Sequence, residues 1–169
     1  FWKIFGPKPE EYEPNNPFTH FPYKNMDLVF QMNESGMSKL HADWLEQLKG
    51  KLCYGGVDLS TSKDLTAFVL LFPPQPGLET AVLLPYIWRP GATAEEAERR
   101  DHVPYRDWAR AGFLQLCDGD IINYSDVEEA IQQAREDYDL RMVGFDPYLS
   151  RTITQRLEPI VPVMEIPQD

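Results

Sequence analysis

The sequence contains no hydrophobic run that approaches the roughly 20 residues needed by a membrane-spanning helix. Its amino terminus, Phe1-Trp2-Lys3-Ile4-Phe5-Gly6, lacks the long apolar stretch and the cleavage site of a secretory signal peptide. These absences argue against a membrane-spanning helix and against a signal peptide in the printed sequence. An initiator methionine is also missing, so we expect the chain to begin inside a longer protein.

Cysteine and positive charge are both scarce. Cys53 and Cys117 are too few for a disulfide framework and lack zinc-binding spacing, so we expect two reduced, partly buried thiols of a cytosolic protein. The 16 Lys and Arg residues oppose 27 Asp and Glu residues, which gives a net charge of −11. The chain therefore lacks the basic face typical of a dedicated duplex-DNA binder. An enzyme that meets phosphates through bound metal ions is still compatible with this charge, because carboxylates build such a site.

Length and composition indicate one globular domain preceded by an arm. The chain has 169 residues, 43% of them hydrophobic and 25% charged, which is enough to bury a core. Five prolines fall within the first 22 residues, and proline interrupts both helices and central strands. We therefore expect residues 1–50 to form a Pro-rich linker or arm with one short helix at 39–49, capped by Ser38 and ended by Gly50. The compact domain is expected at 51–169.

Hydrophobic patterning predicts a mixed α/β fold for this domain. Three strands with short connections should form an antiparallel meander, at Leu52–Leu59, Thr66–Phe72 and Thr80–Trp88. The later elements are helices at Ala94–Asp101 and Tyr105–Ala111, a strand at Leu114–Cys117, a helix at Ser125–Asp139, a strand at Arg141–Phe145, a helix at Leu149–Leu157 and a strand at Ile160–Ile166. The final strand–helix–strand unit should be parallel. Ser125 and Glu128 match a helix-capping box.

Two buried strands each deliver an aspartate at their carboxyl end. The first ends in Gly55-Gly56-Val57-Asp58-Leu59-Ser60 and the later one in Val143-Gly144-Phe145-Asp146-Pro147. The carboxyl edge of an α/β sheet is where sites form, so both carboxylates would face one crevice if the two strands are neighbours. Like charges at short range repel each other, and a divalent cation such as Mg²⁺ or Mn²⁺ relieves that repulsion. A pair of such ions held by carboxylates is the usual equipment for hydrolysing phosphodiesters, so a two-metal site is one interpretation of this pattern.

A structural role for the same aspartates stays open on spacing alone. An Asp after a strand is often a turn former or a helix cap, which suits Asp146 before Pro147 and also Asp64. The sequence contains no P-loop, dinucleotide fingerprint or metalloprotease helix, and its three histidines lie in unrelated contexts. Four aromatic residues are expected to pack the core rather than to stack on bases, namely Tyr86, Trp88, Trp108 and Phe113.

Several motifs follow one another along the chain, namely Cys53-Tyr54-Gly55-Gly56-Val57-Asp58-Leu59-Ser60, Asp64-Leu65-Thr66-Ala67, Arg99-Arg100-Asp101-His102-Val103-Pro104-Tyr105 with Trp108 and Gly112, Ile122-Asn123-Tyr124, Gly144-Phe145-Asp146-Pro147-Tyr148 and the closing 163–168. Taken together and in this order, they resemble the nuclease domain of large terminase subunits from tailed bacteriophages. The resemblance covers roughly residues 51–169. It implies a ribonuclease H-like mixed sheet, a three-stranded antiparallel meander plus parallel strands, flanked by helices and incomplete at the carboxyl terminus.

The resemblance also implies a function and a set of site residues. The family's nuclease cuts concatemeric viral DNA with two Mg²⁺ or Mn²⁺ ions as the capsid is filled, in the cytoplasm of the infected bacterium. Asp58 and Asp146 match two of its catalytic metal ligands, and Asp64 matches a position near the site. The family's third acidic ligand lies beyond the last strand and is absent from this chain, as is the ATPase motor domain. Expected partners are double-stranded DNA, the portal protein and the small terminase subunit. Asn123 stands where the family often has Asp, and we expect it to be structural.

Two other functions remain as alternatives. A non-catalytic fragment that docks on the portal or the small subunit is compatible with the acidic surface and the missing third ligand. An actin-like nucleotide-binding module is suggested by Gly56-Val57-Asp58-Leu59-Ser60-Thr61-Ser62, which resembles a first phosphate loop. Such proteins repeat an Asp-x-Gly loop in a second half, whereas Asp146 is followed by Pro147 and Tyr148.

Overall fold

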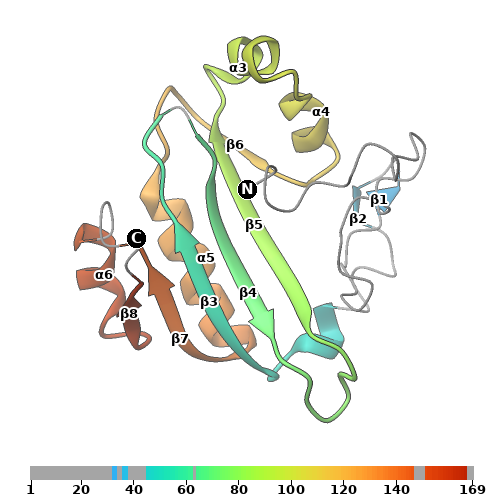
Figure 1. Ribbon diagram of the computed structural model, residues 1–169, viewed down its shortest axis with the longest axis vertical. Helices are drawn as coiled ribbons and strands as arrows, with labels where there is room; N and C mark the ends of the chain where they lie inside the picture. The colour runs from blue at the N-terminus through green and yellow to red at the C-terminus, as the bar shows by residue number, and fades with distance from the viewer. Residues whose placement is uncertain (1–31, 34–35, 38–44, 63, 147–150, 167–169) are drawn as a thin grey trace.

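The structure, a computed structural model, describes residues 32–33, 36–37, 45–62, 64–146 and 151–166. In this part of the chain six strands form one mixed sheet in the order β6-β5-β4-β3-β7-β8 (Figure 1). Their bounds are Leu52–Asp58 for β3, Thr66–Phe72 for β4, Val82–Pro90 for β5, Gln115–Cys117 for β6, Asp139–Phe145 for β7 and Val163–Glu165 for β8. The predicted meander is confirmed, because β4 pairs antiparallel with both β3 and β5. The pairs β5–β6, β3–β7 and β7–β8 are parallel.

Four helices accompany the sheet within the described residues. Their bounds are Ala94–Asp101 for α3, Tyr105–Arg110 for α4, Tyr124–Asp137 for α5 and Arg151–Leu157 for α6. Residues 45–48 are also helical, at the end of the helix predicted for 39–49, and Gly50 follows them with a positive φ of 67°. No helix in this part of the chain is long and apolar enough to cross a membrane.

Most of the predicted arm, including the Ser38 cap, lies outside the described residues. Two strands of two residues each are described there. They are β1 at Met32–Asn33 and β2 at Gly36–Met37, and they pair antiparallel. The division of the chain at residue 50 stays a prediction.

The main core lies between α5 and one face of the sheet (Figure 1). Alternate residues of the central strands point into it, as the period of two in an extended strand requires. Val57 on β3, Phe68 on β4 and Phe145 on β7 are all buried there, together with Val127 and Ile131 of α5. Trp88 is buried in the same core, and Tyr86 packs against it, which confirms the structural role predicted for these aromatics.

The opposite face of the sheet is partly covered by α3 and α4. Ile87 of β5 packs there against a small apolar cluster that contains Ala97 and Tyr105. Trp108 of α4 also belongs to this cluster, and its ring meets the Tyr105 ring edge-on with centroids 5.9 Å apart. Nearer to β3 this face is open, since Tyr54 and its register partner Leu71 are each 40% exposed. The two faces are therefore covered by different parts of the chain.

The capping box predicted at the start of α5 is wrong. Asn123 is the N-cap, and its side-chain oxygen accepts a hydrogen bond of 3.2 Å from the Ser125 backbone N–H. Asn and Ser are comparably good caps, and here Asn123 stands one residue before the helix while Ser125 lies inside it. The Glu128 carboxylate turns instead to the Arg156 guanidinium of α6, at 3.1 Å. The structural role expected for Asn123 is confirmed.

Some element boundaries also differ from the prediction. β5 starts at Val82 rather than at Thr80, because Val82 pairs with Phe72, the last residue of β4. β7 begins at Asp139, two residues early, because that residue pairs with Leu52 at the start of β3. In both cases strand pairing sets the boundary, and single-strand patterning does not reveal it.

Gly55 and Gly56 are adjacent on β3 but differ in the space beside them. A Cβ added at Gly55 would lie 2.7 Å from Cε2 of the buried Phe68 ring, whereas at Gly56 nothing lies within 4 Å. We expect Gly55→Ala to lower the free energy of unfolding by about 1–3 kcal/mol, the usual cost of overpacking a core. Chemical denaturation measures the change, with Gly56→Ala as the matched control. Equal effects of the two substitutions would contradict this packing.

Candidate active site

The two predicted carboxylates lie at the same edge of the sheet. Asp58 is the last residue of β3, and Asp146 directly follows β7. The strands are parallel neighbours, and Val57 stands opposite Phe145 in their register. The condition that the sequence left open, namely that the two strands be adjacent, is therefore met. The arrowheads of β3 and β7 point to this edge in Figure 1.

Both aspartates lie on the face of the sheet that is turned away from α5. Val57 and Phe145 point into the main core, and the next residue of an extended chain points to the other side. Asp58 is accordingly exposed, and Asp146 is half-buried. The core thus fixes the backbone on one side while the carboxylates are available to a ligand on the other.

The electrostatics of this edge disfavour the ionised form of Asp58. The pKa of the Asp58 carboxyl is raised, first because the surrounding protein removes water from it and then because the charges of Asp146 and Asp64 repel its ionised form. Asp58 remains solvent-accessible, so this desolvation is partial. A divalent cation between the carboxylates would reverse the effect by stabilising both ionised forms.

The loop between β3 and β4 is held by hydrogen bonds that the sequence did not reveal. The Ser60 N–H donates to Oγ1 of Thr66 at 2.8 Å, and that hydroxyl donates back to the Ser60 carbonyl at 3.2 Å. The same carbonyl accepts a bond of 3.2 Å from the Tyr124 hydroxyl. Thr66 is fully buried. These contacts fix the chain two residues after Asp58, and only the position of Thr66 at the start of a strand hinted at them.

Asp64 occupies the same loop and is exposed. Its backbone N–H donates to the Ser60 hydroxyl at 3.2 Å, which closes the turn. Its charge reaches Asp58, since it contributes to the raised pKa of that carboxyl. Asp64 is therefore within electrostatic range of Asp58, and a role for it at the site stays a prediction.

The carboxylates suit a hard divalent cation. Mg²⁺ is typically bound by one or two protein carboxylates and completes its coordination with water and substrate phosphates. Asp58 and Asp146 offer such a pair on neighbouring strands. Across the described ranges, no three His, Cys, Asp or Glu side chains form a group that could enclose a metal ion. The described residues thus place two carboxylates at this edge, and metal binding by them stays a prediction.

Three of the five histidines and cysteines considered from the sequence are among the described residues. His20 and His41 are outside the described residues, and His102 caps the carboxyl end of α3 in a left-handed conformation with φ 57°. Cys53 and Cys117 are buried free thiols, as expected. Burial raises the pKa of the Cys53 thiol to about 12, which keeps it protonated and unreactive at neutral pH.

This arrangement of strands and edge carboxylates belongs to a nuclease fold of the ribonuclease H-like class. The chain is a member of the family described as "Terminase large subunit, endonuclease domain", which matches residues 18–169. It is 37% identical over 93 residues to the "Terminase, large subunit" of Enterobacteria phage HK97, covering 55% of this chain and 18% of that protein. The crystal structure of the HK97 bacteriophage large terminase superposes with a TM-score of 0.61 at 29% identity. That superposition covers 76% of this chain and 28% of the HK97 chain, so this chain spans a minor part of its relatives' length.

The raised pKa of Asp58 gives a stability prediction. A carboxyl whose pKa is higher in the folded state costs stability when ionised, and the cost disappears as the pH falls below its ordinary pKa. We therefore expect Asp58→Asn to raise the melting temperature at neutral pH, and the gain to fade toward acidic pH. Thermal unfolding across a pH series measures it. Glu129→Gln, an exposed charge change on α5, is the control; equal gains from both variants would contradict the local origin.

Proposed function

We propose that this chain is the nuclease part of a packaging machine and hydrolyses viral DNA at the Asp58–Asp146 edge with divalent metal ions. The observation that carries the proposal is the placement of both carboxylates. They lie one residue beyond a register pair of neighbouring parallel strands, on the open face of the sheet. Membership of the terminase endonuclease family supports cleavage of DNA as the reaction.

In this proposal the chain's own residues hold the metal ions and keep the site in its geometry. Asp58 and Asp146 bind the cations with their carboxylate oxygens, and Asp64 adds negative charge beside them. When bound there, Mg²⁺ or Mn²⁺ would supply Lewis-acid chemistry that activates a water and stabilises the leaving 3′ oxygen. The Ser60–Thr66–Tyr124 hydrogen bonds keep the β3–β4 loop in place while the DNA strand is cut.

Partners and location are part of the same proposal. The substrate is double-stranded concatemeric DNA, and the portal protein and the small terminase subunit position the machine in the cytoplasm of the infected bacterium. Because this chain is acidic overall, we infer that much of the grip on DNA comes from other parts of the machine.

Nicking of supercoiled plasmid in Mn²⁺ tests the proposal. We expect Asp58→Asn to reduce nicking by more than about a hundredfold, because the cations would lose one of the two carboxylates proposed to hold them. Asp118→Asn is the matched control, since Asp118 also follows a parallel strand, β6, at the same edge but three strands from β3. The same variants are compared in this chain and in a full-length large subunit.

Mn²⁺ binding by calorimetry gives a second readout that does not need turnover. We expect the wild-type chain to bind Mn²⁺. The Asp58→Asn variant should bind it at least about tenfold more weakly, because it lacks one of the two proposed ligands. If neither this chain nor the full-length subunit binds Mn²⁺ or nicks DNA, the two aspartates are structural. The result would then favour the non-catalytic docking role.

A further inference from the structure

The α3–α4 unit stands on the same face of the sheet as the carboxylates. Asp58 is opposite Ala67 in the β3–β4 register, and Ala67 is opposite Ile87 in the β4–β5 register. Residues opposite each other share a face, and two strand spacings amount to about 10 Å. Ile87 packs against α3 and α4, so these helices form a wall about that far from Asp58.

The loop that carries Asp64 rests on this wall. Leu65, the next residue, packs against the apolar cluster that contains Ala97 of α3 and Tyr105 of α4. Arg100 lies in the last turn of α3, in the same unit that Leu65 contacts. The charges show the same proximity: the pKa of Arg100 is raised mainly by Asp101, with a smaller contribution from Asp64.

The Arg100 guanidinium is held by a chain of contacts that leads back to the core of the sheet. Its Nε and Nη2 donate to the two carboxylate oxygens of Asp101 at 2.6 and 2.9 Å. Asp101 Oδ2 also accepts from the Tyr105 hydroxyl at 3.1 Å. The Tyr105 ring in turn lies 4.3 Å from the guanidinium carbon of Arg89, which is 1% exposed on β5. Arg100 is thus oriented before any ligand arrives.

Arg100 still has donors to offer. A guanidinium carries five N–H groups, and Asp101 occupies two of them. The side chain is 52% exposed. Free N–H groups of arginine bind phosphate oxygens in a planar, charge-assisted manner.

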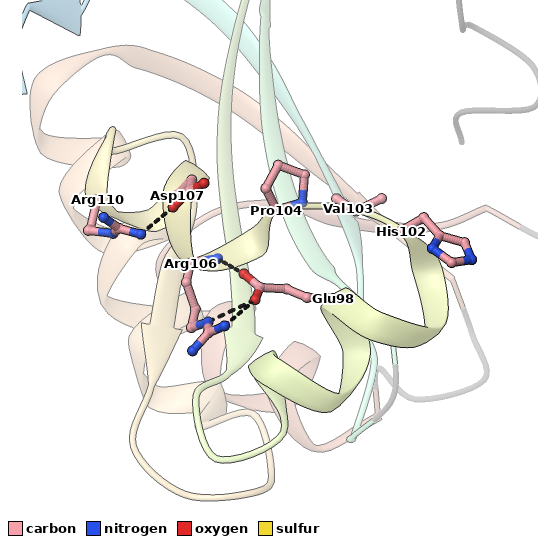
Figure 2. A pocket seen from close by; sticks show the side chains of 7 residues that line it. All are labelled: Glu98, His102, Val103, Pro104, Arg106, Asp107 and Arg110. Atoms are coloured by element: carbon pink, nitrogen blue, oxygen red, sulfur yellow. Dashed lines mark hydrogen bonds and ion pairs between the residues drawn. The ribbon is translucent and has the colours of Figure 1, made fainter.

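The other arginines of the unit also pair with carboxylates of the unit. Arg99 lies 3.7 Å from Glu95. Arg106 pairs with Glu98 at 2.7 Å, and Arg110 pairs with Asp107. Figure 2 shows both pairs around an open pocket of about 360 Å³, which His102 also lines. The pKa of Arg106 is raised by carboxylates of the α3–α4 unit itself, Glu98 first, whereas Arg100 also responds to the charge in the β3–β4 loop.

We propose that Arg100 contacts a backbone phosphate of the DNA strand lying across the Asp58–Asp146 edge, and that Asp101, Tyr105 and Arg89 position it. The inference rests on the proposed function, because it takes DNA as the ligand of that edge. Arg100 would place a positioned positive charge beside the carboxylate edge, on the side where α3 lies. In this proposal Arg100 binds the phosphate directly, whereas Asp101, Tyr105 and Arg89 affect binding only by orienting Arg100.

Fluorescence anisotropy of a labelled short duplex tests this assignment. Binding is measured in Ca²⁺, a cation that carboxylate oxygens bind, and the length of the duplex is checked afterwards. We expect Arg100→Gln to weaken binding about tenfold at low salt and to reduce the slope of log K against log salt by about 0.9, the contribution of one phosphate contact. Arg100→Lys should keep the slope and recover part of the affinity.

Arg135→Gln is the matched control, because Arg135 lies in the last turn of α5 on the other side of the sheet and is exposed. It makes the same charge change, and we expect it to leave the affinity within about twofold and the slope unchanged. Melting temperatures of all variants show whether each is folded.

Tyr105→Phe tests the positioning network. It removes the hydroxyl that donates to Asp101 and keeps the ring beside Arg89. We expect a loss of about threefold in affinity with the salt slope intact. In the Arg100→Gln background the same change should have no further effect, since contacting residues that act through one another are not additive.

The outcomes separate this inference from the proposed function. Equal losses in Arg100→Gln and Arg135→Gln, or no binding by the wild-type chain, would overturn the role of Arg100. If Asp58→Asn abolishes Mn²⁺-dependent nicking while Arg100→Gln binds DNA normally, the nuclease function stands and Arg100 is not its phosphate contact. If Arg100→Gln alone loses affinity and slope while no form of the protein nicks DNA, Arg100 is a phosphate contact and the proposed function is overturned.

Discussion

The parallel pairing of β3 with β7 is the constraint on which the rest of the site depends. It places Asp58 and Asp146 side by side although they are far apart in the sequence. The core stabilises this pairing, because Val57 and Phe145 are both buried against α5. Displacing β7 by one residue would turn its buried side chains outward, so the hydrophobic effect fixes the register and with it the carboxylates.

The carboxylates at this edge of the sheet repel one another, and the surrounding hydrogen bonds hold the backbone beside them in place. Desolvation and the charges of Asp146 and Asp64 raise the pKa of Asp58, and perturbed carboxyls of this kind concentrate at functional sites. Nearby, the buried Thr66 and the Tyr124 hydroxyl fix the backbone at Ser60. A backbone fixed at Ser60 beside repelling carboxylates is an arrangement that suits a positively charged ligand.

The two faces of the sheet have separate tasks. One face is filled by α5 and provides the stability of the domain, while the other carries the carboxylates and the α3–α4 wall. Arg89 connects the sheet to the α3–α4 wall, since it is buried on β5 and lies against the Tyr105 ring of α4. An acidic chain can therefore present a positioned arginine beside an acidic edge without a basic surface overall.

The sequence by itself determined the kind and order of the elements, because apolar periodicity, proline and glycine act locally. It also determined that Asp58 and Asp146 end buried strands, and its ordered motifs predicted the family that the comparisons show. It misplaced the cap of α5, since Asn123 and Ser125 are both good caps and only their geometry decides between them. Only the tertiary structure decided that β7 lies beside β3 and that Leu65 packs against the α3–α4 wall. These contacts join segments distant along the chain, and their partners are chosen by burial and strand register, which no single segment contains.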